Sequence, residues 1–237
     1  MVVSDPCQGR ILGPVTTTRR LEPMMGVVFD CDGVLVNTEE LGWEVWRSLA
    51  SNYGIELTLE DLRAVTGCTD SESVAYFSRW LEPDQLAKLG SQFEASFSAA
   101  LRDRTEPYAD ALESIVELRE RGVPVAVASN STIAQVHSSL GRAGLSDLVD
   151  FVAGVDQVDA PKPAPGIYRH AAAALNCETV VAVEDSPAGI ASAVAAGLPV
   201  LAVDRGAFGV EQLNEASLVV PLISYGAIAA LGTPPNR

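Results

Sequence analysis

From residue 26 onward, short runs of apolar, mostly β-branched residues alternate with segments in which apolar positions recur at helical spacing. Each apolar run is nearly continuous, which is typical of parallel strands buried on both faces. The predicted strands are residues 27–30, 123–129, 151–154, 179–184 and 200–204, with a weaker candidate at 217–220. The predicted helices between them are residues 110–121, 133–143, 164–175 and 187–196. These repeated β-α-β units predict an α/β fold built on a doubly wound parallel sheet.

One long stretch, residues 39–104, has no strand pattern and only helical periodicity. The apolar positions fall into three helical groups: Leu41, Val45 and Leu49; Val74, Phe77 and Leu81; and Leu86, Leu89, Phe93, Phe97 and Leu101. A structureless loop of this length would be unusual inside a compact fold. We therefore predict a helical subdomain at 39–104, inserted into a core formed by residues 24–38 and 105–237. We expect Trp43, Trp46 and Trp80 to pack inside the insert rather than to contact a ligand.

The first 23 residues show neither pattern. They contain Pro6, Pro14 and Pro23 and a run of threonines, a composition that predicts a flexible tail at 1–23. The pair Arg19-Arg20 resembles part of a twin-arginine export signal, but the apolar stretch that follows contains two aspartates. We therefore predict that the protein is not exported and that its folded part begins at the Met24-Met25 pair.

Composition and charge exclude several classes of protein. With 237 residues, 48% of them hydrophobic and 20% charged, the chain can bury a sizeable core and is not intrinsically disordered. Sixteen Lys and Arg against 31 Asp and Glu give a formal net charge of −15, which argues against binding to nucleic acid or anionic lipid. No apolar run reaches the roughly 18 residues that suggest a membrane span. An anionic substrate would need a local positive site in this acidic protein.

The four cysteines, Cys7, Cys31, Cys68 and Cys177, lie far apart and share no C-x-x-C spacing. This distribution argues against a zinc site and against a disulfide framework. It predicts free thiols, as expected of a protein in the reducing cytoplasm.

Polar residues gather where the predicted strands end. The first strand ends in FDCDG, the second ends in ASNS, a loop after the third reads DAPKPAP, and the next strand ends in VEDSPAG. Ligands bind at the carboxyl ends of parallel strands. The segments therefore place one set of side chains around a single rim: Asp30, Asp32, Ser129, Asn130, Lys162, Glu184 and Asp185.

This set of side chains suits one kind of chemistry. Its four carboxylates would repel one another unless a cation lay among them, and oxygen ligands favour Mg²⁺ over zinc. A lysine, a hydroxyl and backbone N–H groups add the donors that a transferring phosphoryl group requires. Asp30 and Asp32 lie two residues apart, so in an extended segment their side chains point to the same side. One could attack phosphorus while the other protonates the leaving oxygen and then activates water.

In this order, the four segments resemble the motifs of the haloacid dehalogenase superfamily of phosphohydrolases, from about residue 26 to residue 220. The family pattern is D-x-D-G-[TV], a hydrophobic residue followed by Ser or Thr, then Lys, then a pair of acidic residues. The resemblance implies a Rossmann-like core in which Asp30 is the nucleophile and Asp32 the general acid and base. It assigns phosphate binding to Ser129, with Asn130 beside it, and to Lys162, which also stabilises the nucleophile. It implies that Asp30, the backbone carbonyl of Asp32, and Asp185 hold Mg²⁺, with Glu184 helping directly or through water.

The helical insert resembles the cap of the β-phosphoglucomutase-like branch, which closes over small phosphorylated metabolites. Mutases of that branch carry a His shortly after the first motif and an Arg in a G-x-x-R turn, where this chain has Gly42 and Asp70. These departures favour hydrolysis, and Asp32 favours phosphate esters over the substrates of the dehalogenase and phosphonate-cleaving branches.

We therefore predict a cytoplasmic, Mg²⁺-dependent phosphatase of a small phosphorylated metabolite, such as a sugar or polyol phosphate. One alternative is a β-phosphoglucomutase-like sugar phosphomutase, and another is a non-catalytic binding protein on the same scaffold. The sequence leaves the oligomeric state open.

Overall fold

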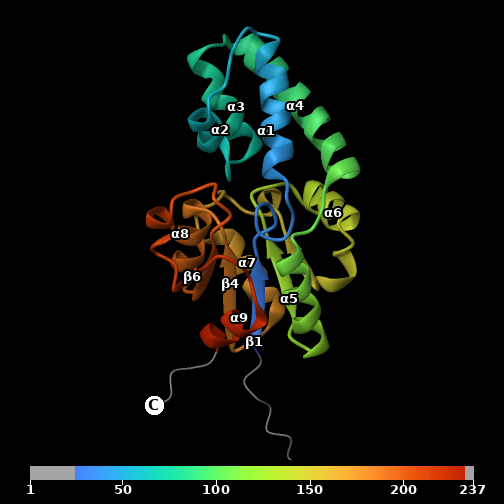
Figure 1. The fold of residues 1–237 in the computed structure, drawn as a ribbon, viewed down its shortest axis with the longest axis vertical. Coiled ribbons are helices and arrows are strands. Elements are labelled where there is room, and N and C mark those ends of the chain that lie inside the picture. Colours follow the sequence, from blue (N-terminus) through green and yellow to red (C-terminus); the bar gives the residue numbers. More distant parts are fainter. Residues whose placement is uncertain (1–24, 233–237) are drawn as a thin grey trace, which may run out of the picture.

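A computed structural model describes residues 25–232 and contains a six-stranded sheet in the order β3-β2-β1-β4-β5-β6 (Figure 1). All neighbouring strands are parallel. The strands are β1 (Met25–Phe29), β2 (Val125–Ala128), β3 (Phe151–Ala153), β4 (Thr179–Glu184), β5 (Val200–Val203) and β6 (Leu218–Val220). Each overlaps a predicted strand, and the predicted doubly wound parallel sheet is confirmed. The predicted tail at 1–23, which includes Cys7, and Met24 of the predicted start lie outside the described residues.

The strand order creates a switch point between β1 and β4. The chain proceeds from β1 to β2 and β3 on one side, and then continues with β4 on the other side of β1. The two central strands are paired along their length, with Phe29 opposite Val183, and the N–H of Asp30 donates to the carbonyl of Val183 at 2.9 Å. Ligand crevices in open α/β sheets form at such switch points, beyond the carboxyl ends of the strands.

Helices cover both faces of the sheet because side chains alternate along each strand. Val27 and Phe29 belong to one hydrophobic cluster, whereas Val28 between them belongs to the other. The first cluster packs against α5 (Ala109–Glu120), α6 (Ile133–Arg142) and α9 (Tyr225–Gly232), and the second against α7 (Gly166–Leu175) and α8 (Pro187–Ala195). The four helices predicted between strands are confirmed as α5 to α8, and α9 is an addition. Short 3₁₀ turns are η1 (Phe77–Arg79), η2 (Ser146–Leu148), η3 (Val155–Gln157) and η4 (Val210–Leu213).

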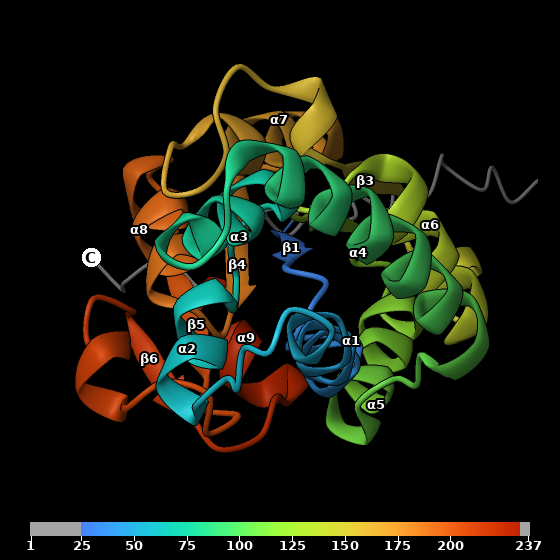
Figure 2. The same cartoon turned by 90° about the horizontal axis from the view of Figure 1, so that it is seen from above.

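The segment predicted to be helical forms a group of helices with its own hydrophobic cluster. The helices are α1 (Glu39–Ser51), α2 (Leu59–Val65), α3 (Asp70–Tyr76) and α4 (Pro83–Arg104). They lie beyond the carboxyl ends of the strands, and the view from above shows them spread over the sheet (Figures 1 and 2). We call this group the cap. The division of the chain into domains at its two ends stays a prediction.

Aromatic stacking holds the interior of the cap together. The ring of Trp46 stacks on Phe93 with 3.7 Å between ring centroids, and Phe93 stacks on Phe97 at 5.1 Å. Trp46 is buried as expected, but Trp80 is 41% exposed, so the prediction that it packs inside was wrong. Trp80 follows a short 3₁₀ turn that ends α3, and there its ring contacts Tyr76 and Phe77 from the outside.

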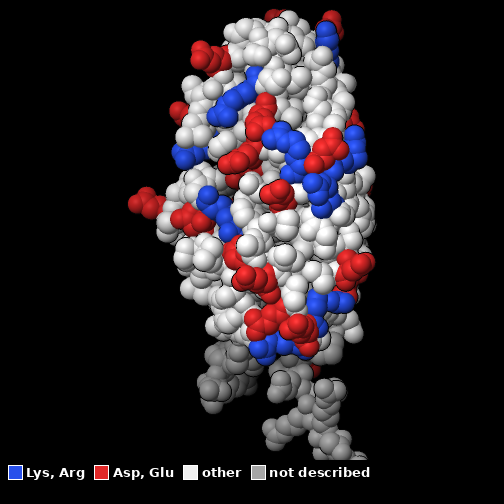
Figure 3. Space-filling model, turned by 45° about the vertical axis from the view of Figure 1, so that its right-hand side comes forward, with Lys and Arg blue, Asp and Glu red and all other residues white. Residues whose placement is uncertain are grey.

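The outer surface carries charges of both signs. On the face shown in Figure 3, blue basic groups are interspersed with red acidic groups from the top of the molecule to its base. Within residues 25–232, none of the helices combines the length and the hydropathy that crossing a bilayer requires.

Candidate active site

The structure brings all seven predicted site residues to the carboxyl ends of the strands. Six of them line one cavity between the sheet and the cap: Asp30, Asp32, Ser129, Asn130, Lys162 and Asp185. The seventh, Glu184, is fully buried and contacts Lys162. The rim predicted from the strand ends is therefore a single site in space.

Lys162 is the positive centre of this site. Its Nζ donates to Asp30 Oδ1 at 2.6 Å and to Glu184 Oε1 at 2.7 Å. The ammonium lies 4.8 Å from the centroid of the Tyr168 ring, and the Tyr168 hydroxyl donates to the same Glu184 oxygen at 2.9 Å. Burial alone would lower the pKa of Lys162, but the carboxylates of Asp30 and Glu184 outweigh it and raise that pKa. Lys162 therefore remains charged at neutral pH.

Glu184 is held by the turn that begins α8. Its Oε2 accepts hydrogen bonds from the backbone N–H groups of Asp185 and Ser186, at 2.9 and 3.0 Å, and from the Ser186 hydroxyl at 3.0 Å. Gly189 leaves room for this carboxyl group, because a Cβ at that position would collide with it. Burial raises the pKa of Glu184, but the Lys162 charge and these hydrogen bonds lower it below its usual value. Glu184 is thus a fixed negative charge that orients Lys162.

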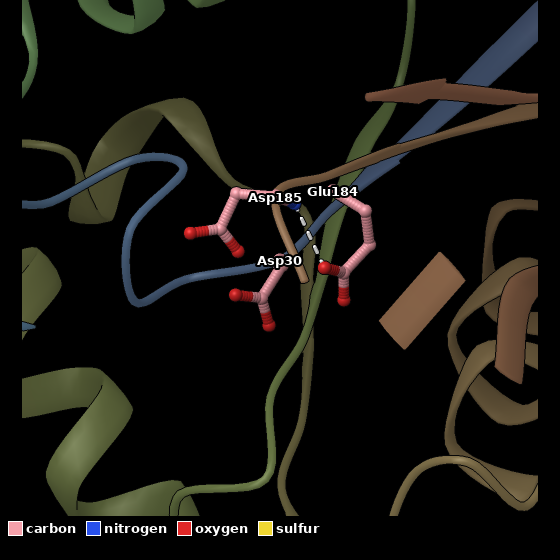
Figure 4. Close-up of side chains that lie close together, drawn as sticks. All are labelled: Asp30, Glu184 and Asp185. Carbon is pink, nitrogen blue, oxygen red and sulfur yellow. Dashed lines mark hydrogen bonds between the residues drawn. The ribbon is translucent and has the colours of Figure 1, made fainter. Parts of the chain in front are cut away.

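The protein's own positive charge does not fully compensate the carboxyl groups of Asp30 and Asp185. Figure 4 shows these two side chains and Glu184 projecting to the same side, and one oxygen from each lies within 4.8 Å of the others. The Asp185 carboxyl accepts no hydrogen bond from the described residues, although Asp185 is only 5% exposed. Burial, together with neighbouring carboxylates, raises the pKa of Asp30 to about 8 and that of Asp185 well above its usual value. A buried group of carboxyl oxygens with excess negative charge fits a hard divalent cation such as Mg²⁺.

Asp32 differs from Asp30 in its surroundings, because hydroxyl groups hold it. Thr38 donates to its Oδ1 at 2.7 Å, and Ser129 and Ser131 donate to its Oδ2 at 3.1 and 3.0 Å. The Ser129 hydroxyl, predicted to bind phosphate, therefore also orients Asp32. Our sequence analysis missed Thr38 and Ser131, although Ser131 is the second serine of the ASNS segment and could have been singled out.

A half-buried arginine fixes the turn that follows Asp32. The Arg205 guanidinium donates to the carbonyls of Gly33 and Val34 at 3.2 and 3.3 Å, and it pairs with both carboxyl oxygens of Asp110 at 3.1 and 3.0 Å. Gly33 adopts a φ of 82°, and a side chain there would collide with Asp185. The sequence analysis did not single out Arg205, because a lone arginine after a strand carries no motif.

Asn130 links the core of the site to the cap. Its side-chain oxygen accepts from the N–H of Lys162 at 2.9 Å, and its side-chain nitrogen donates to the carbonyl of Gly67 at 3.2 Å. A second link joins Gln135 of α6 to Asp70 of α3, at 2.9 Å. These contacts set how the cap faces the catalytic rim.

The cap side of the cavity is mainly aromatic. Its lining includes Trp43, Trp46, Phe93 and Phe97, so the two tryptophans that pack in the cap also face the cavity, and the prediction that they do not contact a ligand stays a prediction. Trp43 is fixed by a 3.0 Å hydrogen bond from its indole nitrogen to the Thr66 hydroxyl. The tryptophans of α1 thus serve both the packing of the cap and the wall of the cavity.

Comparisons with known proteins agree with this geometry. Residues 27–203 match the family model described as haloacid dehalogenase-like hydrolase. The chain is 34% identical over 183 residues to a phosphoglycolate phosphatase of Cereibacter sphaeroides (strain ATCC 17029), covering 74% of this chain and 83% of that protein. A crystal structure of a HAD family hydrolase from Deinococcus radiodurans R1, with bound phosphate and sodium, is 31% identical; the match has a TM-score of 0.69 and covers 90% of this chain and 99% of that one.

Some relatives are much longer than this chain. The chain is 31% identical over 181 residues to the bifunctional riboflavin kinase/FMN phosphatase of Arabidopsis thaliana, covering 75% of this chain. It spans 48% of that protein and 17% of another plant relative. The activities of those whole proteins therefore do not transfer directly to this chain.

Proposed function

Because the chain belongs to the haloacid dehalogenase-like hydrolase family, we propose that it is a Mg²⁺-dependent phosphatase of a small phosphorylated metabolite, in the class of sugar and polyol phosphates. The observation that carries this proposal is the contact of one buried lysine with a carboxylate at the end of β1, beside a second carboxylate that accepts no hydrogen bond from the described residues. A nucleophile, a fixed cation and a place for a divalent ion thus meet at the switch point of the sheet. In keeping with its free thiols, the proposed location is the cytoplasm.

Asp30 is the proposed nucleophile. Its Oδ1 is neutralised by Lys162, while its Oδ2 accepts no hydrogen bond from the described residues. Attack by an Asp30 oxygen on phosphorus forms the aspartyl-phosphate as the bond from phosphorus to the alcohol oxygen breaks. The Lys162 ammonium stabilises the negative charge on the phosphoryl oxygens during this transfer.

Asp32 is the proposed acid and base. In its protonated form it donates a proton to the departing alcohol oxygen, and as a carboxylate it then accepts one from the water that attacks the aspartyl-phosphate. The attack by water releases inorganic phosphate and regenerates Asp30. The hydrogen bonds from Thr38, Ser129 and Ser131 keep Asp32 in one orientation through both steps.

The residues proposed to hold Mg²⁺ are Asp30, Asp185 and the backbone carbonyl of Asp32. Glu184, the third carboxylate of the group, would help to hold the ion directly or through water. When bound, Mg²⁺ would offset the charge of these carboxylates and of the phosphoryl oxygens. This role of Asp185 is supported by its lack of a salt bridge among the described residues, whereas Asp30 pairs with Lys162.

Hydrolysis is favoured over phosphomutase chemistry by the lining of the cavity. A mutase must bind a second phosphate, which requires a second positive group. Among the described residues that line the cavity, Lys162 is the only Lys, Arg or His. Asp70, in the cap, is acidic.

The test is phosphate release from a panel of sugar, polyol and nucleotide monophosphates, measured with Mg²⁺ and again with EDTA. We expect release with Mg²⁺, loss of release with EDTA, and no release by the Asp30→Asn variant. If folded, Mg²⁺-loaded protein released phosphate from none of the esters, the proposal would be wrong. Rearranged sugar phosphate without free phosphate would instead identify a mutase.

A further inference from the structure

We propose that the cap selects phosphate esters by the charge of their alcohol part, accepting neutral or cationic alcohols and rejecting those with a second anionic group. Asp70 and Glu39 are the proposed specificity-determining residues. This inference rests on the proposed phosphatase function and adds the chemical class of the substrate.

The first observation is the distribution of charge around the cavity. The one cationic residue among the described residues that line it, Lys162, lies on the core side and already pairs with Asp30 and Glu184. The cap and the segment leading into it contribute two acidic lining residues, Glu39 and Asp70. Arg205, which holds the turn after Asp32, already pairs with Asp110 and donates hydrogen bonds to two backbone carbonyls. Burial raises the pKa of Glu39 to about 7 and also raises the pKa of Asp70. At a pH above these pKa values, a carboxylate or second phosphate on the alcohol would meet negative groups and no free positive one among the described lining residues.

The second observation is that Asp70 is held in place. Gln135 of α6 donates to its Oδ2 at 2.9 Å, whereas its Oδ1 accepts no hydrogen bond from the described residues. Asp70 begins α3, and the preceding residue, Thr69, is fixed by reciprocal hydrogen bonds with Glu72. Asp70 therefore cannot turn away from an incoming anion without breaking its bond to Gln135. Like charges held together in a partly buried site repel each other more strongly than in water.

The third observation is the aromatic wall next to these acids. Trp43 and Trp46 line the cavity beside Phe93 and Phe97, and Trp46 is stacked between Phe93 and Phe77. Aromatic rings pack against the C–H groups of an alcohol and attract a cation over their faces. They provide nothing that would neutralise an anion. The wall and the two acids thus favour the same kinds of alcohol.

The selection can be tested with three esters of nearly equal size. The alcohol part is neutral in 2-hydroxyethyl phosphate, cationic in phosphoethanolamine and anionic in phosphoglycolate. We expect kcat/KM for phosphoglycolate to be about tenfold or more below that of the neutral ester, because of the repulsion by Asp70 and Glu39. The cationic ester should be hydrolysed at least as well as the neutral one.

Variants link this ranking to the named residues. Asp70→Asn keeps an acceptor for Gln135 but removes the charge, and we expect it to reduce the discrimination against phosphoglycolate about tenfold. Glu39→Gln should act in the same direction. The matched control is Asp84→Asn, which removes one negative charge from an exposed position on α4 outside the cavity and should leave the ranking unchanged.

The results separate this inference from the proposed function. Equal kcat/KM for the neutral and anionic esters, or an unchanged ranking in both Asp70→Asn and Glu39→Gln, would overturn the selection by charge while the phosphatase activity stands. If no ester is hydrolysed, the proposed function fails, and calorimetric binding of the same three esters to Asp30→Asn with Mg²⁺ decides the selection. Selection by charge would be supported if phosphoglycolate bound more weakly than the other esters and bound better to the double variant Asp30→Asn, Asp70→Asn. Equal binding of all three esters would refute selection by charge.

Discussion

The core side and the cap side of the cavity hold their side chains in place in different ways. On the core side, Lys162, Glu184 and Asp32 are fixed by short hydrogen bonds to groups at the ends of strands. On the cap side, Trp46 and Phe93 are fixed by stacking within a helical cluster. Charged hydrogen bonds on rigid strands define the positions of reacting atoms, whereas packed aromatic surfaces define shape. The difference supports the proposal that the core carries the chemistry and the cap the selection.

The largest effect should come from Asp30, the proposed nucleophile on the core side. Asp30→Asn replaces the attacking carboxylate with an amide, and we expect turnover to fall by about 10³-fold or more. Steady-state phosphate release measures this loss, and circular dichroism verifies that the fold is retained. Asp84→Asn, a matched change on the surface, should keep full activity. Substantial turnover by Asp30→Asn would remove Asp30 from the mechanism.

Removing the core cation should impair both activity and stability. Lys162→Met leaves Asp30 and Glu184 buried without their positive partner, which for a buried pair destabilises by about 3–5 kcal/mol. Denaturant unfolding measures this change, and phosphate release should fall by about 10²-fold or more. Lys88→Met, at an exposed site on α4, is the control. A Lys162→Met protein with unchanged stability would contradict the role of Lys162 as the charge that holds the group together.

The core side should also respond to Mg²⁺ in a pH-dependent way. Burial raises the pKa of Asp30 from 3.8 to about 8, so without metal the folded protein binds a proton more tightly than the unfolded chain does. The free energy of unfolding of the metal-free protein should therefore fall as pH rises from about 4 to about 8. Mg²⁺ competes with this proton, so it should raise Tm more at about pH 8 than at about pH 5.

Thermal unfolding with Mg²⁺ or EDTA at the two pH values measures this effect. Asp185→Asn should reduce the stabilisation by Mg²⁺, because it removes one of the proposed ligands. A Tm that rises equally with Mg²⁺ at both pH values would contradict a metal site built on these carboxyl groups.

A smaller effect should follow from loosening Asp32. Ser131→Ala removes one of three hydroxyl donors to Asp32, and a single hydrogen bond to a charged group contributes about 1.5–3 kcal/mol. We expect kcat to fall by about tenfold or more with little change in KM, since the substrate is bound by other groups. Ser91→Ala, on the exposed side of α4, is the control. If KM rose and kcat did not change, Ser131 would contact substrate rather than position Asp32.

The parts of the fold that the sequence predicts are those with a strong local pattern. The central strands, such as Thr179–Glu184, are buried on both faces, so their apolar runs are unmistakable. α4 is long enough for its periodicity to show. α2 and α9 were not predicted, because α2 has only 7 residues and α9 is uniformly apolar and small, without a polar face to mark it. Trp80 was misplaced because a helical pattern does not reveal where a helix ends.

The residues of the candidate site also fall into those that a local pattern predicts and those that it does not. Asp30, Asp32 and Lys162 lie in short segments that follow strands, so topology alone brings them together. Tyr168 and Arg205 reach the site from the first turn of a helix and from a loop, and their contacts depend on packing that no local pattern encodes. The role of Asn130 as a link to the cap likewise depends on where Gly67 lies in space.

The most direct test of the central claim is to trap phosphate on Asp30. Asp32→Asn should slow hydrolysis of the aspartyl-phosphate, whereas p-nitrophenyl phosphate, whose leaving group needs no proton, still lets it form, so that rapid acid quenching after mixing this ester with the variant and Mg²⁺ preserves it. The account predicts that mass spectrometry of the digested protein finds a phosphoryl group on the peptide that contains Asp30. This group should be absent with EDTA and absent in the double variant that carries both Asp30→Asn and Asp32→Asn. Phosphate release by the wild type with no phosphoryl group on Asp30, or with one on another residue, would contradict it.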